Sequence, residues 1–235
     1  MDRKTAILLA ALIVLMFPAA AYAEPTVTGP TGLLVIPTAD TVTMSHMWVG
    51  INWLDLDTIV MPDQSLEGGT AWTALLTGGL SDNFELGIGY MLQEESDNGV
   101  LFNGKYRIVN DDEEQWYPAV ALGATVSNFS GNTNSEIYLV GSKFFWVTPH
   151  DEYSGSIHAG IDYMKLQGND WKFEYFLGAD VALTEEIVAI AEFSQDNDAF
   201  GDGFSWGVRY FFNKKTTAQA GLIDGNLAIG GSYIF

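Results

Sequence analysis

The sequence contains no cysteine and few basic residues. Without cysteine the chain can form neither disulfides nor thiolate metal sites, so stability must come from backbone pairing and side-chain contacts. Lysine and arginine number 10 against 30 aspartates and glutamates, which gives a formal net charge of −20. Because phosphate binding needs clusters of basic side chains, we do not expect a nucleic-acid partner. A hydrophobic fraction of 48% argues against intrinsic disorder.

Long hydrophobic runs are also scarce. The run at residues 6–17 is shorter than the roughly 20 residues that a membrane-spanning helix needs. It follows two basic residues and precedes a small-residue cleavage sequence at 21–23, which together indicate a cleaved secretory signal peptide over residues 1–23. We therefore expect the mature chain to begin at Glu24 and to be exported through the inner membrane of a Gram-negative bacterium.

From residue 47 onward, apolar and polar residues alternate in short segments separated by Gly, Asn, Asp and Ser. Alternation with a period of two is typical of β-strands that have one apolar face. It predicts about twelve strands, near 47–55, 70–80, 84–93, 100–109, 118–127, 135–147, 154–165, 171–183, 187–194, 204–212, 217–223 and 227–235. The fold class is therefore all-β. In the segment 135–147 both faces carry apolar residues, so the sequence does not indicate which face of this strand points outward.

The apolar faces are predicted to point outward, into lipid. A barrel of more than about eight strands is too wide for side chains to fill its interior easily. Aromatic residues cluster near the strand ends, as in the girdles of transmembrane barrels. The last strand alternates up to Tyr233 and Phe235 and resembles the terminal strand by which outer-membrane barrels are recognised for assembly. We expect an antiparallel, up-and-down outer-membrane β-barrel over residues 47–235, with lipid, lipopolysaccharide and the barrel-assembly machinery as partners.

The lengths of the connections give an orientation. Short connections at 81–83, 184–186 and 213–216 follow even-numbered predicted strands, and long ones at 58–69 and 195–203 follow odd-numbered strands. We therefore expect short turns at the periplasmic rim and long loops outside.

The polar faces carry charges of both signs. The predicted lumen network comprises Glu85, Lys105, Arg107, His158, Asp162, Lys172, Glu174, Asp180, Glu192 and Arg209. Buried charges are costly unless paired, so mixed signs suit a cross-barrel ion-pair network that narrows or fills the lumen. Alternatively, they form a constriction that selects a polar or charged solute.

Most of the remaining acidic residues fall in the predicted loops and turns. Asp196, Asp198 and Asp202 supply oxygen ligands close together, as calcium would need. Their spacing is not that of an EF-hand loop, so solvated surface is the alternative. No other cofactor is expected.

An enzymatic activity is not expected. His158 has Ser156 two residues away on the same face, but this face is predicted to point into the lumen, and no Gly-x-Ser-x-Gly sequence occurs. We therefore interpret His158 as a lumen histidine that is paired with Asp162 or another neighbour.

Residues 24–46 precede the first predicted strand and contain the sequence GLLVIPTAD at 32–40. This resembles the motif near the amino terminus of YjbH-like outer-membrane proteins, carried here by Gly32, Leu33, Pro37, Thr38 and Ala39. The resemblance implies an outer-membrane barrel with an accessory role in exopolysaccharide production. The segment could enter the lumen as a plug, pair as an extra strand, or serve as a spacer.

The expected function is a non-enzymatic envelope protein that acts as a narrow channel or accessory factor for export of an exopolymer. Two alternatives are a general porin-like channel for small solutes and a structural or surface-interaction barrel whose acidic loops bind cations.

Overall fold

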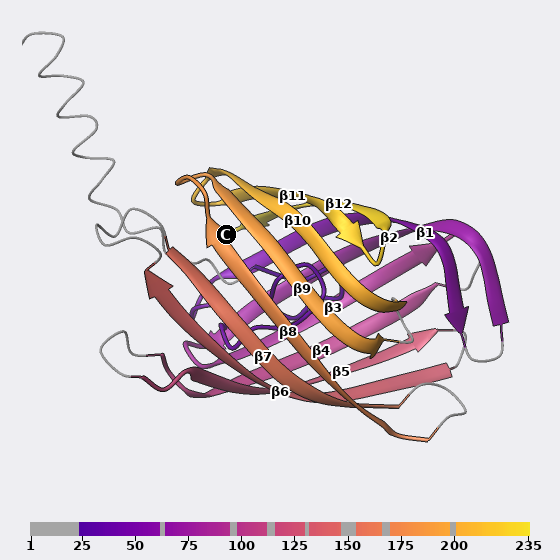
Figure 1. Cartoon of the computed structure of the whole chain (residues 1–235), viewed down its shortest axis with the longest axis horizontal. Helices are drawn as coiled ribbons and strands as arrows, with labels where there is room; N and C mark the ends of the chain where they lie inside the picture. The colour runs from indigo at the N-terminus through magenta and orange to yellow at the C-terminus, as the bar shows by residue number, and fades with distance from the viewer. Residues whose placement is uncertain are drawn as a thin grey trace, which may run out of the picture.

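A computed structural model of the chain describes residues 24–61, 64–94, 98–111, 116–129, 132–146, 154–165, 170–197 and 201–235. They form one sheet of twelve strands: β1 (Met47–Met61), β2 (Gln64–Ser81), β3 (Phe84–Gln93), β4 (Gly99–Val109), β5 (Ala119–Phe129), β6 (Asn132–Trp146), β7 (Ser154–Lys165), β8 (Lys172–Ala182), β9 (Ile187–Asn197), β10 (Gly201–Asn213), β11 (Thr216–Ile223) and β12 (Asn226–Ile234). Each strand pairs with its chain neighbours, and β1 pairs with β12 (Figure 1). This closed antiparallel barrel confirms the predicted fold class.

Closure joins the two ends of the barrel sequence. β1 pairs antiparallel with β12 from Trp48 opposite Ile234 to Leu54 opposite Ala228. The Phe235 N–H also donates to the Met47 carbonyl at 2.9 Å. Across the described residues the sheet is closed and has no edge strand, as a lipid environment requires.

The alternation of residues along the strands places apolar side chains outside and polar ones inside. On β8, Phe173 is 64% exposed on the outer surface, whereas the neighbouring Glu174 is 3% exposed inside. The outward aromatic residues gather near strand ends, where Tyr163 stacks on Trp171 with ring centroids 4.8 Å apart. An apolar outer band with aromatic residues at its borders is the surface of a transmembrane barrel.

Large inward side chains lie over glycines of the adjacent strand. The Tyr138 ring on β6 occupies the space that a side chain on Gly123 of β5 would need, and the Phe176 ring on β8 does the same over Gly160 of β7. Glycine at these positions allows the rings to lie flat along the wall. The register also settles the orientation of β6, whose even-numbered residues face the lumen.

The two rims of the barrel differ from the prediction in one respect. β1 begins and β12 ends at the same rim, here called the terminal rim, together with the tight turns at 82–83 and 214–215. At the opposite rim, pairing continues through much of the predicted loop 58–69, for example with Thr58 opposite Glu67. β9 and β10 likewise extend into the predicted loop 195–203. The prediction of long loops over these residues was wrong, because backbone pairing does not require apolar alternation once a strand has left the lipid.

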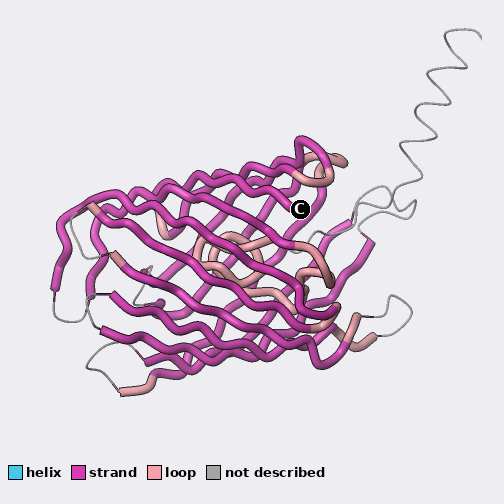
Figure 2. The backbone as a smooth tube through the Cα atoms, turned by 180° about the vertical axis from the view of Figure 1, so that it is seen from behind, coloured by secondary structure: helices cyan, strands magenta, loops and turns pink. Residues whose placement is uncertain are grey.

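Residues 24–42 lie inside the barrel. Figure 2 shows them as a loop surrounded by strands. All of them except Thr28, Val35 and Asp40 are buried. The predicted signal peptide lies outside the described residues. Within the described ranges, no helix is long and apolar enough to span a membrane.

Candidate functional site: a plugged lumen

Residues 24–42, hereafter the plug, have a compact fold of their own. The Thr26 N–H donates to the Pro30 carbonyl at 2.8 Å, and the Leu33 N–H donates to the Ile36 carbonyl at 3.0 Å. These bonds close two successive turns. Of the three alternatives left open by the sequence, the structure shows a plug rather than an extra strand or a spacer.

The motif residues build the plug. A Cβ added to Gly32 would lie 2.6 Å from the Thr26 Cγ2 atom and 2.9 Å from the Pro37 Cα atom, so only glycine fits between these two segments. Leu33 and Ala39 are buried in the apolar cluster between the plug and the wall. The motif therefore specifies how the plug folds on itself and packs on the barrel.

The second turn is held by two wall residues of opposite charge. The Glu192 carboxylate on β9 accepts the N–H groups of Leu34, Val35 and Ile36 at 3.2, 2.9 and 3.3 Å. The Arg209 guanidinium on β10 donates to the Leu33 carbonyl at 3.0 Å. Hydrogen bonds to charged groups are stronger than neutral ones, so this turn is firmly anchored.

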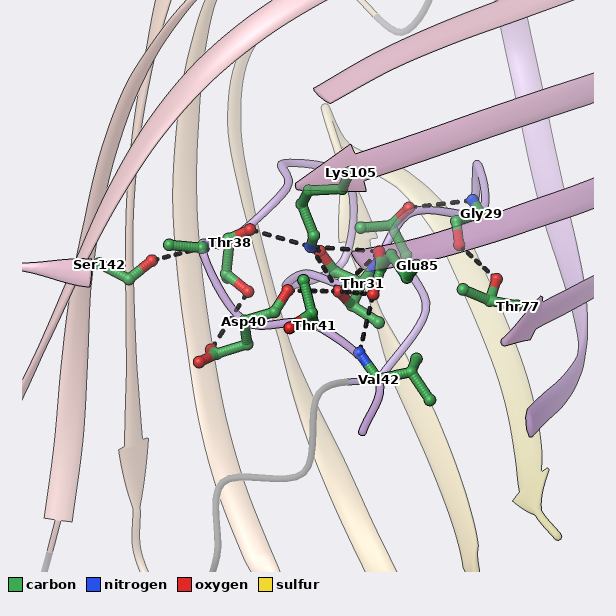
Figure 3. Close-up of polar contacts among 12 residues, drawn as sticks. Gly29, Thr31, Thr38, Asp40, Thr41, Val42, Thr77, Glu85, Lys105 and Ser142 are labelled. Carbon is green, nitrogen blue, oxygen red and sulfur yellow. Dashed lines mark hydrogen bonds and ion pairs between the residues drawn. The ribbon is translucent and has the colours of Figure 1, made fainter. Parts of the chain in front are cut away.

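A second pair of charges lies on the other side of the plug (Figure 3). Lys105 on β4 and Glu85 on β3 form a buried ion pair, with Nζ 3.3 Å from Oε1. Glu85 also accepts the N–H groups of Thr31 and Val42 at 3.0 and 2.9 Å. Lys105 donates to the carbonyls of Thr31 and Thr38 at 2.7 and 3.0 Å, and to the Thr31 hydroxyl. Each buried charge is thus compensated by plug dipoles.

A chain of hydrogen bonds reaches the plug from β6, β7 and β8. His158 lies between Asp180, 2.9 Å from its Nε2, and Ser142, 2.8 Å from its Nδ1. The Ser142 hydroxyl in turn accepts the Ala39 N–H at 2.8 Å. These three side chains have the composition of a hydrolase triad, but here the serine oxygen is used to hold a plug amide. Asp180, rather than the predicted Asp162, is the partner of His158.

The first residue of the plug is an acid in a buried environment. Glu24 is 2% exposed; its Oε2 lies 3.1 Å from Nε of Arg209 and accepts the Thr217 hydroxyl at 2.9 Å. Burial raises the pKa of the Glu24 carboxyl above its ordinary value, and the Arg209 guanidinium opposes this shift. Glu24 thus binds the plug to β10 and β11 at a cost in desolvation.

Glycines of the wall make room for the apolar side chains of the plug. A Cβ on Gly178 of β8 would lie 2.6 Å from Leu33 Cδ1 and 2.5 Å from Ile36 Cδ1. Leu34 Cδ1 lies 3.0 Å and 2.9 Å from where Cβ atoms on Gly207 and Gly221 would be. We call these two places the Gly178 socket and the Gly207–Gly221 socket. Each is a space left by wall glycines and filled by apolar side chains of the plug.

The other predicted lumen residues lie at other places on the wall. Arg107 donates to the Asp82 carbonyl at 2.8 Å near the terminal rim. Asp162 and Glu174 are opposite each other on β7 and β8, and Lys172 begins β8 at the opposite rim. The members of the predicted network that hydrogen-bond to the plug include Glu85, Lys105, Glu192 and Arg209.

Sequence reasoning missed several residues that hold the plug. Glu24 lies in the segment before the first predicted strand, and Ser142 lies on β6, whose orientation the sequence does not fix. Only Glu24 carried a signal, since an acid next to an apolar, Pro- and Gly-containing segment needs a partner when that segment is buried.

The calcium prediction falls on residues that the structure describes only in part. Asp196 lies on β9 and Asp202 on β10, whereas Asp198 lies outside the described residues. In the described ranges, no group of three or more His, Asp or Glu side chains could hold a metal ion.

Comparison with known proteins supports the fold. No family model and no curated protein matches the chain. The solved structure of the KdgM porin in complex with disordered oligogalacturonate is similar with a TM-score of 0.55 at 14% identity, covering 80% of this chain and 99% of the porin. The outer-membrane protein Omp33 of Acinetobacter baumannii is similar with a TM-score of 0.52 at 12% identity, covering 83% and 98%.

A channel from the outer membrane of Pseudomonas putida F1 has a TM-score of 0.50 at 11% identity, covering 84% of this chain and 98% of the channel. The fold is therefore that of outer-membrane porin-like barrels. At these identities the likeness establishes the architecture, and the plugged lumen has to be interpreted from its own residues.

Proposed function

We propose that this protein is a non-enzymatic outer-membrane channel for small solutes that is closed by its own plug. The observation that supports it best is the position of the plug, which is held from opposite sides of the lumen by Glu85 on β3 and Glu192 on β9. A segment bound across the lumen blocks the path that solutes take through a porin-like barrel.

The manner of binding suits a gate. The plug joins the barrel through residues 43–46 and adds no strand to the sheet. Its release would break side-chain contacts, each worth about 1–3 kcal/mol, and would leave every strand pair intact. The barrel can therefore open without unfolding.

The lumen charges favour neutral or cationic solutes. KdgM is described in complex with oligogalacturonate, an acidic sugar polymer. In this chain, both buried cations of the wall have a carboxylate of the wall as a neighbour: Lys105 pairs with Glu85, and Arg209 attracts Glu192. With formal charge −20 over the whole chain, anionic solutes would also be repelled on approach.

A disulfide lock tests the gate. Leu33 Cδ1 lies 2.6 Å from the position of a Cβ on Gly178. Because Cδ1 is two bonds from the Leu33 Cβ, the two Cβ atoms lie at most about 5 Å apart, and a small shift of the plug brings them to the roughly 3.8 Å of a disulfide. We expect Leu33→Cys/Gly178→Cys to conduct in planar bilayers when reduced and to stop when oxidised.

The chain has no native cysteine to interfere with this lock. Leu33→Cys alone is the matched control and should respond to neither reagent. Equal conductance in the oxidised and reduced states would show that ions do not pass where the plug sits. If neither state conducts, the channel function fails altogether.

A second candidate is an accessory role in exopolymer export, supported by the resemblance of residues 32–40 to the YjbH-like motif. Loss of exopolymer after gene deletion, with unchanged envelope permeability, would favour this role over a general channel. If the Gly32→Ala protein restored exopolymer export to the deletion strain, the role in export would not depend on the motif.

A further inference from the structure

We propose that the plug site is a receptor for apolar peptides that adopt the turns of the plug, so that a peptide from another polypeptide can take the place of the plug. This rests on the proposed function only in that displacement of the plug would open the channel. Binding itself can be measured without conductance.

The wall binds the backbone of the plug more than its side chains. Wall carboxylates and a hydroxyl accept six backbone N–H groups, those of Thr31, Leu34, Val35, Ile36, Ala39 and Val42. Wall side chains donate to five backbone carbonyls, those of Gly29, Thr31, Gly32, Leu33 and Thr38. Every polypeptide carries these groups, so the contacts do not depend on one particular sequence.

Selectivity comes from the two sockets. The Gly178 socket receives Leu33 and Ile36, and the Gly207–Gly221 socket receives Leu34. A wall side chain at any of these glycines would overlap an apolar group of the plug. The site is therefore shaped for consecutive apolar side chains.

An oligosaccharide fits these features less well. Its hydroxyls could bond to Glu192 and Arg209, but it has no branched apolar groups for the glycine sockets. An acidic sugar would also place its charge beside Glu85 and Glu192. The combination of paired backbone-directed charges with apolar sockets points to a peptide.

Charge compensation explains why one peptide would replace another. If the plug left an empty site, Glu192 would lose three N–H donors. Buried charges without partners are costly. A ligand that supplies both N–H and carbonyl groups at the same spacing lowers this cost, and water in an open lumen does so less completely.

A change on the plug side tests the proposal with the wall intact. In full-length Leu34→Gln, a polar side chain meets the Gly207–Gly221 socket, so its own plug is weakened. A fluorescently labelled synthetic peptide of residues 24–42 should then bind to the detergent-solubilised protein, with anisotropy as the readout. A change in electrophoretic mobility on heating would show that the variant barrel is folded.

Two matched peptides give the contrast. The peptide with Leu34→Gln cannot fill the socket, and the peptide N-methylated at Val35 cannot donate to Glu192 Oε1, a bond of 2.9 Å. Because a hydrogen bond to a charged group is lost, we expect N-methylation to weaken binding about tenfold or more. The oxidised Leu33→Cys/Gly178→Cys protein should bind no peptide.

The outcomes separate the two proposals. Peptide binding without any conductance would uphold the receptor and overturn the channel. Conductance in Leu34→Gln with no peptide binding would uphold the channel and overturn the receptor. The receptor also fails if oligogalacturonate displaces the plug and the peptides do not, or if N-methylation leaves affinity unchanged.

Discussion

At the scale of single residues, the plug is held by charged side chains that bind backbone groups. Glu85, Lys105, Glu192 and Arg209 are each buried, and each has partners on the plug. Acids and bases alternate among these four wall residues, so each of the four charges has an oppositely charged neighbour as well as its partners on the plug. This accounts for a mixed-sign lumen in a strongly acidic protein.

Glu24 should make the docking of the plug depend on pH. Burial raises the pKa of this carboxyl above 4.5, although the Arg209 guanidinium opposes the shift. The docked plug therefore holds the proton more tightly than the released plug, and release gives up a proton. Docking is strongest below pH 4.5 and weakens as the pH rises through the raised pKa. We expect channel openings in planar bilayers to become more frequent over that range.

Glu24→Gln is the control for this pH dependence, because the amide cannot titrate and still fits the site. Its openings should follow the pH less steeply than those of the unchanged protein. An identical pH profile in the two proteins would assign the effect to other groups.

The sequence predicts which residues face the lumen but not what they bind. Alternation places Glu192 and Arg209 on polar faces, which is a local property of two strands. Their partners, Leu33 to Ile36, lie more than 150 positions earlier in the chain. Such contacts follow from closure of the barrel around the plug, and no local pattern encodes them.

At the scale of elements, the strands were predictable because lipid imposes a period of two. The bounds of β3 and β7 agree with the sequence prediction, since both strands lie within the apolar band. β1 and β2 run past their predicted ends, where Thr58 pairs with Glu67 outside the band. The alternation ends where contact with lipid ends, whereas backbone pairing continues.

Gly32→Ala should loosen the plug without harming the barrel. The new Cβ would lie 2.6 Å from Thr26 Cγ2 and 2.9 Å from Pro37 Cα, which forces the two turns apart. Overpacking of this kind costs about 1–3 kcal/mol. We expect faster hydrogen exchange at plug amides and faster cleavage of the plug by an added protease, with unchanged exchange in the strands.

Gly141→Ala is the matched control, because an added Cβ there finds its nearest neighbours at 3.7 Å. It should leave plug exchange as in the unchanged protein. Unaltered protection of the plug in Gly32→Ala would show that the motif glycine is not needed for its fold.

At the scale of the whole molecule, the barrel meets two environments with two sets of side chains. The outer surface exposes apolar side chains from every part of the barrel, such as Ile88 on β3 at 44% and Ile229 on β12 at 48%. The interior holds the charges and the plug. A soluble protein would hide the first set, so this surface requires lipid. The terminal aromatic residues Tyr233 and Phe235 belong to the same surface, and their role as an assembly signal stays a prediction.

Leu177→Arg tests the lipid-facing assignment directly. Leu177 lies at the middle of β8 and is 50% exposed, so the arginine would enter the apolar band near the bilayer midplane. Arginine at that depth destabilises membrane barrels by about 2–4 kcal/mol. We expect a loss of this size in unfolding equilibria measured in lipid vesicles. Lys214→Arg, in the turn at the terminal rim, should cost almost nothing. Equal stability of Leu177→Arg and the unchanged protein would place this face in water and remove the physical basis for a membrane channel.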